Sequence, residues 1–357
     1  MLEYDPLIEL RDDAGLLMDR RERPDARSAA RSYGSCVTRG IALTLAEKEM
    51  LLFAFLQWVS IALGFYLWVQ MLFWIPDEVW ESARHSRRGS PADLVLLAWS
   101  FVCVGVAAFP LGIFSSCMAA VHLMRSVGQP STIASCMRLT LPQTWRVWVL
   151  QWWDGWFTVL RILDRLPKRD SESRSDRMVR EARYYAWKLA IAGLTPSLLL
   201  GRDLKQASAE SLDLLRHKFE RVARLRFGYS LACWVVGIAT YVGTLVFLNS
   251  DYVRSTLPDR SELANRIGAI YAWAGIPMLA SAAVILVVLR PAYLVGLIDI
   301  YLDRQIERKV RIELPFKPGR LAGPLVAFAI LLLMLGVVWL YRGPLGIQAL
   351  LDIPYGN

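Results

Sequence analysis

The stretch "MLLFAFLQWVSIALGFYLWVQMLFWI", residues Met50 to Ile75, decides the class of the fold. It contains no Asp, Glu, Lys or Arg. A helix needs about 20 consecutive apolar residues to cross the hydrocarbon core of a bilayer, and this run is longer than that. Its apolar residues are continuous, whereas the surface helix of a soluble protein would show them at regular intervals. The run therefore predicts a membrane-spanning helix.

Four further uncharged apolar runs predict additional spans: Leu94–Met124, Phe227–Leu248, Ala269–Leu289 and Leu321–Tyr341. The short alternating segments of a transmembrane barrel are not seen. The sequence thus predicts an all-α, polytopic transmembrane helical bundle with five spans and with cytoplasmic amphipathic or interfacial helices. Seven spans remain possible, because Trp145–Leu163 and Tyr184–Leu200 are also rich in apolar residues.

The positions of Lys and Arg predict the orientation of the chain. Of 41 such residues, 34 fall before the first span, between the second and third, or between the fourth and fifth. Cytoplasmic loops are enriched in positive charge, so these three regions are expected inside. The same reasoning explains the net charge of +9 without a nucleic-acid partner.

This orientation predicts five regions along the chain. We expect a cytoplasmic N-terminal segment over 1–49, a first transmembrane hairpin over 50–124, a basic cytoplasmic or interfacial helical region over 125–226, three further spans over 227–341 with a cytoplasmic amphipathic helix at 291–310, and a short external tail over 342–357. The N-terminus lacks the apolar core of a cleavable signal peptide. The first span is therefore expected to direct insertion into a bacterial inner membrane.

A second quoted stretch, "TWRVWVLQWWDGWFTVLRIL", carries five of the fourteen tryptophans. On a helical wheel Trp145, Trp148, Trp152 and Trp156 form one stripe, and the charged residues Arg146, Asp154 and Arg161 lie opposite. Tryptophan favours the membrane interface, where its ring is buried and its N–H stays hydrated. The pattern predicts a helix lying in the cytoplasmic interface with these four rings against lipid. A tryptophan-lined ligand site is the alternative.

Two other segments are amphipathic. In 203–226 an apolar face contains Leu215 and Phe219, and Arg216, Arg221 and Arg224 lie among its charged residues. We expect these arginines to contact a protein partner or anionic lipid, with the helix continuing as a lever into the span at 227. In 291–310 Asp299 and Asp303 stand one turn apart. We expect an exposed charged face there, although paired carboxylates also occur in acid–base catalysis.

Motifs of catalysis and cofactor binding are missing from the sequence. It has no phosphate-binding glycine loop and no zinc-protease or serine-hydrolase signature. Its five cysteines contain no C-x-x-C pair, and its three histidines are scattered. We therefore expect no disulfide, no metal site, no cofactor and no enzymatic activity.

Three stretches share a similar order of residue types: 27–55, 131–152 and 205–227. Each begins with a part rich in Ser and Ala, continues with periodically spaced apolar residues and with basic residues, and ends in an apolar segment. This order suggests three units of cytoplasmic helix plus membrane hairpin, the middle hairpin degenerate, although chance similarity of composition remains an alternative.

The stretch "LTPSLLLGRDLKQASAESLDLLRHKF", Leu194 to Phe219, resembles a loose family of poorly characterised bacterial integral membrane proteins related to the membrane domain of glycerophosphodiester phosphodiesterases. The resemblance rests on Pro196 and on the Ala-x-x-x-Ser-Leu pattern from Ala207 to Leu212, and it covers about 180–244. It implies a polytopic helical fold and carries no catalytic residue onto this chain.

Together these features favour a non-catalytic scaffold or accessory subunit of an envelope assembly, with membrane lipids and other subunits as partners. The runner-up is a transporter or channel component, possibly for lipid, and a membrane enzyme comes third. A transporter would require a polar cavity at membrane depth, and a scaffold would require closed helix packing with an exposed apolar surface.

Overall fold

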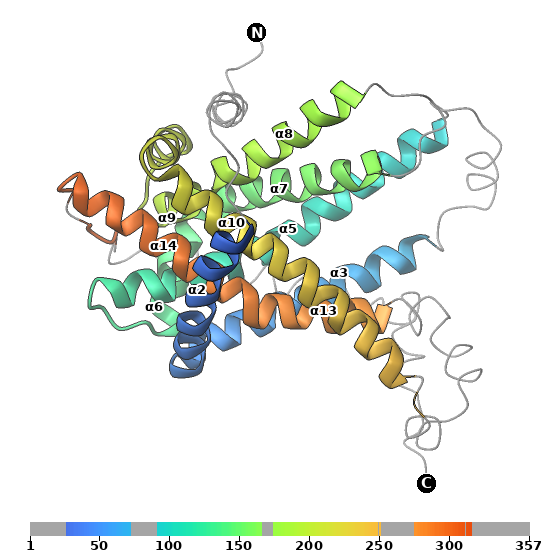
Figure 1. The fold of residues 1–357 in the computed structure, drawn as a ribbon, viewed down its shortest axis with the longest axis horizontal. Helices are drawn as coiled ribbons and strands as arrows, with labels where there is room; N and C mark the ends of the chain where they lie inside the picture. Colours follow the sequence, from blue (N-terminus) through green and yellow to red (C-terminus); the bar gives the residue numbers. More distant parts are fainter. Residues whose placement is uncertain are drawn as a thin grey trace.

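The computed structural model describes residues 26–72, 91–165, 174–248, 250, 275–310 and 312–315. Within these ranges every regular element is a helix. In chain order they are α2 (Ala26–Ala46), α3 (Lys48–Leu72), α5 (Pro91–Ser126), α6 (Ile133–Thr140), η1 (Leu141–Gln143), α7 (Thr144–Arg165), α8 (Arg174–Ala190), η2 (Ile191–Gly193), α9 (Leu194–Leu199), α10 (Leu204–Leu248), α13 (Ile276–Val284), the π-helical turn η4 (Ile285–Leu289) and α14 (Arg290–Glu307). The predicted all-α fold class is confirmed (Figure 1).

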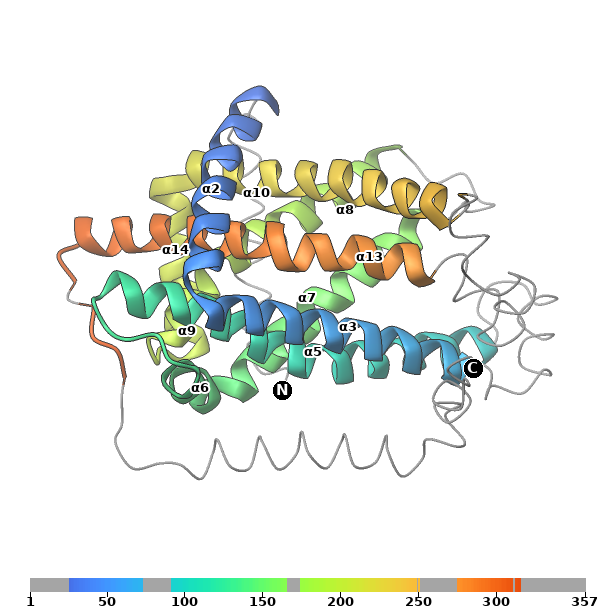
Figure 2. The same ribbon diagram turned by 90° about the horizontal axis from the view of Figure 1, so that it is seen from below.

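Four segments are long and apolar enough to cross a membrane: Lys48–Phe65, Leu97–Ser126, Leu204–Leu248 and Ile276–Glu307. They contain or overlap the first four predicted spans. The fifth predicted span, Leu321–Tyr341, lies outside the described residues. Figure 2 shows α3, α5, α13 and the later part of α10 running in similar directions, with α2 across one end. The protein is a multi-pass helical membrane bundle.

The crossing of α2 over α14 depends on one glycine. A Cβ atom added at Gly40 would lie 2.4 Å from the Ala292 Cα, so no larger residue fits between the two backbones. Beside it, the Tyr33 hydroxyl donates a hydrogen bond of 2.7 Å to the Leu289 carbonyl. Small residues allow helices in membrane proteins to approach in this way.

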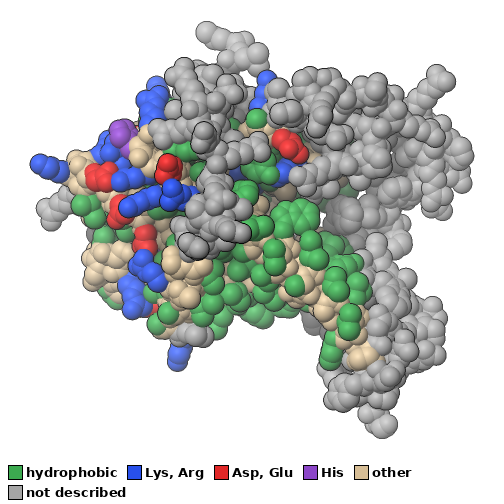
Figure 3. Space-filling view, viewed as in Figure 1, with side chains coloured by type: hydrophobic (Ala, Val, Ile, Leu, Met, Phe, Trp, Pro, Cys, Tyr) green, Lys and Arg blue, Asp and Glu red, His purple; other side chains and the backbone are tan. Residues whose placement is uncertain are grey.

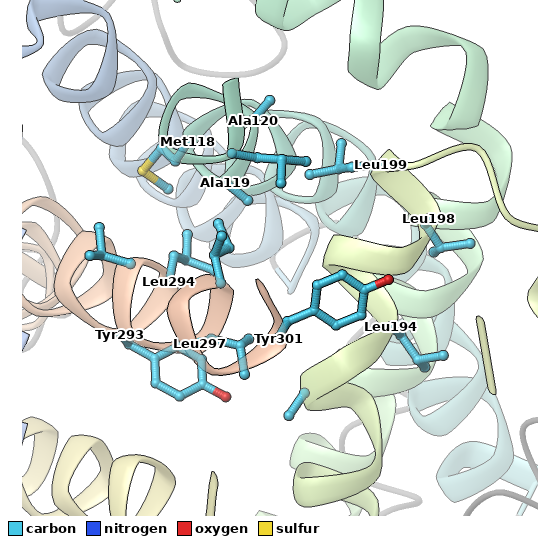
Figure 4. Close-up of a cluster of buried hydrophobic side chains, with 14 of the residues drawn as sticks. Met118, Ala119, Ala120, Leu194, Leu198, Leu199, Tyr293, Leu294, Leu297 and Tyr301 are labelled. Atoms are coloured by element: carbon cyan, nitrogen blue, oxygen red, sulfur yellow. The ribbon is translucent and has the colours of Figure 1, made fainter. Parts of the chain in front are cut away.

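The hydrophobic core lies where α5, α9 and α14 meet (Figure 4). Met118 and Ala119 from α5, Leu198 from α9, and Leu294 and Tyr301 from α14 are among its members. This arrangement corrects the prediction for 291–310. We expected a helix on the cytoplasmic surface, but residues 291–298 are buried on every side and continue α13 without a break. The charged face begins only at Asp299, because α2, α5 and α10 enclose the earlier turns.

Helix α10 contains one break in its 45 residues. Lys218 has a φ of −123° and a ψ of 24°, outside the helical region. The predicted lever over 203–226 is therefore bent at Lys218. From Phe219 onward the helix is continuous through Phe227 to Leu248. Helix α10 is thus unbroken at the point where its apolar half begins.

Helices α7 and α8 form a pair beside α5 and α10. Helix α7 runs antiparallel to α5, since Gly112 faces Val147 near one end and Val104 faces Gly155 further along. The first of the three stretches with similar residue order contains α2, which precedes α3 and α5. The second contains α6, which precedes α7 and α8. The third contains the start of α10, which precedes the apolar half of α10 and α13. Each stretch thus supplies a helix that precedes a pair of longer helical segments.

Candidate functional site

The tryptophan stripe of α7 packs on α5. Trp148 Nε1 donates to the Gly105 carbonyl at 2.7 Å, and Trp152 Nε1 donates to the Phe101 carbonyl at 3.1 Å. The ring of Trp156 lies edge-on to the Phe101 ring, with 4.9 Å between centroids. Only Trp145 of the four stays largely exposed, at 68%.

This packing corrects the prediction that all four rings face lipid headgroups. The reason is a small residue on α5: a Cβ at Gly105 would lie 2.7 Å from Trp152 Cε2, so the indole rests directly over the glycine. The Trp148 and Trp152 rings also stack on each other, 5.4 Å between centroids. The alternative of a ligand site lined by these rings finds no support, since they fill the space against α5 and one another.

The opposite side of α7 carries an ion pair with α8. Lys188 Nζ, whose residue is only 5% exposed, donates to Asp154 Oδ1 and, at 3.1 Å, to Thr158 Oγ1. Trp187 Nε1 donates to the same carboxylate oxygen at 3.2 Å. A buried ion pair is tolerated only when further hydrogen bonds satisfy it, as they do here. This pair ties α7 to α8.

Two arginines lie near this pair, at the ends of two predicted spans. Arg226 precedes the apolar half of α10, and Arg290 follows η4. Both interact electrostatically with Asp154. We call Lys188, Arg226 and Arg290, with Asp154, the cationic cluster. Asp154 is paired with Lys188, and the two arginines lie within electrostatic range of the same carboxylate.

The two arginines are held by aromatic rings and a hydroxyl. The Arg226 guanidinium carbon lies 5.5 Å from the ring centroids of both Tyr229 and Tyr293, which stack on each other at 4.6 Å. Arg290 Nη2 donates to Ser115 Oγ at 2.9 Å. Within the described part of the chain, Arg226 forms no hydrogen bond or salt bridge, and the buried Arg290 Nε has no partner.

The predicted docking arginines of α10 are engaged within the protein. Arg221 Nη1 lies 3.0 Å from Asp303 Oδ2, and Arg224 Nη2 lies 2.9 Å from Glu220 Oε2. The second contact joins residues one turn apart on the same helix. Arg216 also has an interaction partner. Arg221 and Arg224 therefore form ion pairs within the protein.

The two aspartates of α14 form ion pairs with other helices. Asp299 accepts from Arg39 Nη1 at 2.9 Å and lies 2.8 Å from His122 Nε2, while Asp303 contacts Arg221. The cations come from α2, α5 and α10. Each carboxylate has its own cationic partner, so the two do not form a shared acid–base pair.

The cationic cluster was not identified from the sequence. Lys188 and Asp154 were visible as charges inside apolar segments, a pattern that often marks a functional site in a membrane protein. Arg226 and Arg290 looked like ordinary span-flanking residues. Their convergence depends on the packing of α8, α10 and α14, which no local pattern encodes.

No group of three or more His, Cys, Asp or Glu side chains arranged to bind a metal occurs in the ranges that the structure describes. Comparison with known proteins gives no further assignment: no family model matches this sequence, and neither does any curated protein or solved structure.

Proposed function

We propose that the protein is a non-catalytic membrane scaffold that holds a transmembrane helix of a partner protein against α10. The observation that carries this proposal is the exposure of α10. Within the described residues, none of its most apolar 18-residue window is buried, whereas 61% of the corresponding window in the α13–α14 segment is. Figure 3 shows hydrophobic side chains gathered over the region of α10 and α13.

The exposed surface of α10 consists of large apolar side chains on several faces. Val235 is 60% exposed and Val246 is 65% exposed, and Leu231, Ile238, Val242 and Phe247 are also exposed. The main described contact of this half is with α13. In a membrane, helices associate by close packing of such surfaces. A helix that leaves most of its circumference unpacked is suited to receive another helix.

The base of α10 is fixed to α14 by ion pairs. Arg304 forms two hydrogen bonds with the Asp213 carboxylate, at 2.9 and 3.0 Å, and Lys218 contacts Glu307. Together with the Arg221 contact, these pairs join the two helices on the polar side of the bend. A partner helix on α10 would thus be held at a fixed position relative to the whole bundle.

This proposal changes the surface expected to bind a partner. The sequence pointed to Arg216, Arg221 and Arg224, but their charge is already used in internal pairing. Among the described residues, the exposed apolar face of α10 has no such internal role. The proposed location remains a bacterial inner membrane with the N-terminus inside, supported by the distribution of Lys and Arg.

A second candidate function, a transporter or channel component, is supported by Asp154 and Lys188, two charged residues within apolar segments. Ionisable residues at membrane depth are characteristic of transport pathways. Asp154 and Lys188 sit on helices beside the apolar part of α5. A structural role is enough to explain these two charges, because they pair with each other and their hydrogen bonds are satisfied. We therefore favour the scaffold.

Site-specific photocrosslinking in cells tests the scaffold. A benzophenone amino acid is placed at Val235 or Val242 on α10, and at Val102 or Val106 on α5 as matched exposed controls. We expect a discrete protein adduct from α10 that the α5 positions do not give. The same adduct pattern from both helices, or adducts with lipid alone, would refute a partner helix on α10. Solute transport by the purified protein in liposomes would then favour the second candidate.

A further inference from the structure

The cationic cluster and a neighbouring apolar groove fit one kind of ligand. We infer that Arg226 and Arg290 bind the phosphate of an anionic phospholipid, and that one of its acyl chains follows the groove between α10 and α13. This inference does not depend on the proposed scaffold function, because it concerns a lipid site that either a scaffold or a transporter could contain.

The charge of the cluster is the first argument. Asp154 is hydrogen-bonded to Lys188, which leaves the two arginines without a carboxylate of their own among the described residues. Half-buried cations without a counter-charge are unfavourable. Among the described residues the Arg226 guanidinium has no hydrogen-bond partner, and arginine binds phosphate through two parallel hydrogen bonds. An external phosphate would supply the missing charge and accept these bonds.

The position of the cluster is the second argument. Arg226 and Arg290 stand where the apolar halves of two spans give way to the polar end of the molecule. The Arg226 guanidinium lies over the ring of Tyr293, which follows Arg290 by three residues on α14. The two arginines therefore lie at a similar depth along the bundle. Phosphate groups of lipids occupy this boundary between hydrocarbon and water, and tyrosines are enriched there.

The groove is the third argument. It has a volume of about 330 Å³ and is lined by Cys233, Trp234, Gly237, Ile238, Tyr241 and Ser281. Its first residue, Cys233, interacts with Tyr229 and is within electrostatic reach of both arginines. The groove therefore begins beside the cluster and leads away from it along α10.

The length and chemistry of the groove suit a fatty acyl chain. Along the groove, from Cys233 to Tyr241, the helix rises roughly 12 Å, most of the ~15 Å depth of one hydrocarbon leaflet. The absence of a side chain at Gly237 leaves space in the groove where α10 meets α13, since a Cβ there would lie 3.3 Å from Ile285 Cδ1. The Ser281 hydroxyl is satisfied by the Gly237 and Pro277 carbonyls, which leaves the lining apolar.

Lipid binding to the purified full-length protein tests the inference. The delipidated protein in detergent is titrated with phosphatidylglycerol, and bound lipid is counted by native mass spectrometry. We expect one tightly retained phosphatidylglycerol per chain, and no comparable retention of zwitterionic phosphatidylcholine.

Two variants address the two halves of the site, each with a matched control. R226Q removes the headgroup donor and should weaken binding about tenfold or more. R224Q, two residues away and paired with Glu220, should stay within about twofold. I238W fills the groove and should reduce lipid retention, whereas V242W on the same helix should not. Thermal denaturation of each variant verifies that it is folded.

Three outcomes would overturn the inference. The first is unchanged phosphatidylglycerol binding by folded R226Q. The second is equal loss of binding in R226Q and R224Q, which would indicate general surface attraction. The third is displacement of the lipid by inorganic phosphate together with normal binding in I238W, which would show that the cluster recognises a free anion.

Discussion

A disulfide between α5 and α7 would test where the tryptophan-rich helix lies. The pair V104C and G155C joins the two helices at a point of direct contact. A Cβ built at Gly155 lies 2.8 Å from Val104 Cγ1. Across a disulfide, the Cβ of one cysteine lies about 3 Å from the sulfur of the other. A cysteine sulfur at the Cγ1 position of residue 104 would therefore be placed to bond with residue 155.

The expected gain in stability follows from the loop that the bond closes, from residue 104 to residue 155. The loop-entropy relation gives ~4 kcal/mol for a loop of this size. Engineered disulfides often deliver less, because the native geometry must adjust. In V104C the Cγ1 atom that would clash with the added Cβ is replaced by the bonded sulfur, so little steric penalty is expected.

The assay uses a background in which the five native cysteines are replaced by alanine. After mild oxidation, a maleimide polymer that adds mass to each free thiol reports whether the pair has reacted. We expect protection of V104C with G155C, and full labelling of the control pair V102C with G155C. Val102 is 50% exposed and points away from α7. Equal labelling of both pairs, with the protein folded, would show that α7 lies apart from α5, as the sequence alone suggested.

Three further predictions concern packing, reactivity and topology. G40A should destabilise the protein by about 1–3 kcal/mol through its clash with Ala292, whereas G34A, which has no neighbour within 4 Å, should be neutral or slightly stabilising by thermal denaturation. Burial raises the pKa of the Cys136 thiol to about 12, so it should resist alkylation in the folded protein while a cysteine at the exposed Ala134 reacts. Because the unfolded thiol ionises near a pH of about 8.5, Cys136 should also lower stability as the pH rises above that value, and C136A should lessen this loss. A cysteine at Ser173 should resist an impermeant maleimide in intact cells, because the distribution of Lys and Arg places it on the cytoplasmic side; labelling there would contradict the five-span topology and favour seven spans.

The sequence alone determined that this is a helical membrane protein, because continuous apolar runs are a local property. Four of the five predicted spans appear in the described residues, and the amphipathic faces of 203–226 are those observed, with Leu215 and Phe219 buried. The pairing of Arg224 with Glu220 was also predictable, since it depends only on spacing along one helix.

Only the tertiary structure decided what each face contacts. A helical wheel places Trp148 and Trp152 on one side of α7, but the surface that receives them is set by Gly105, over forty residues earlier in the chain. Arg226 and Arg290 meet because α10 and α14 pack together, with Leu225 lying against Gly296. Periodicity specifies the direction of a side chain relative to its own helix. Its partner depends on which small residues of distant helices allow close approach, and that information is spread over the whole chain.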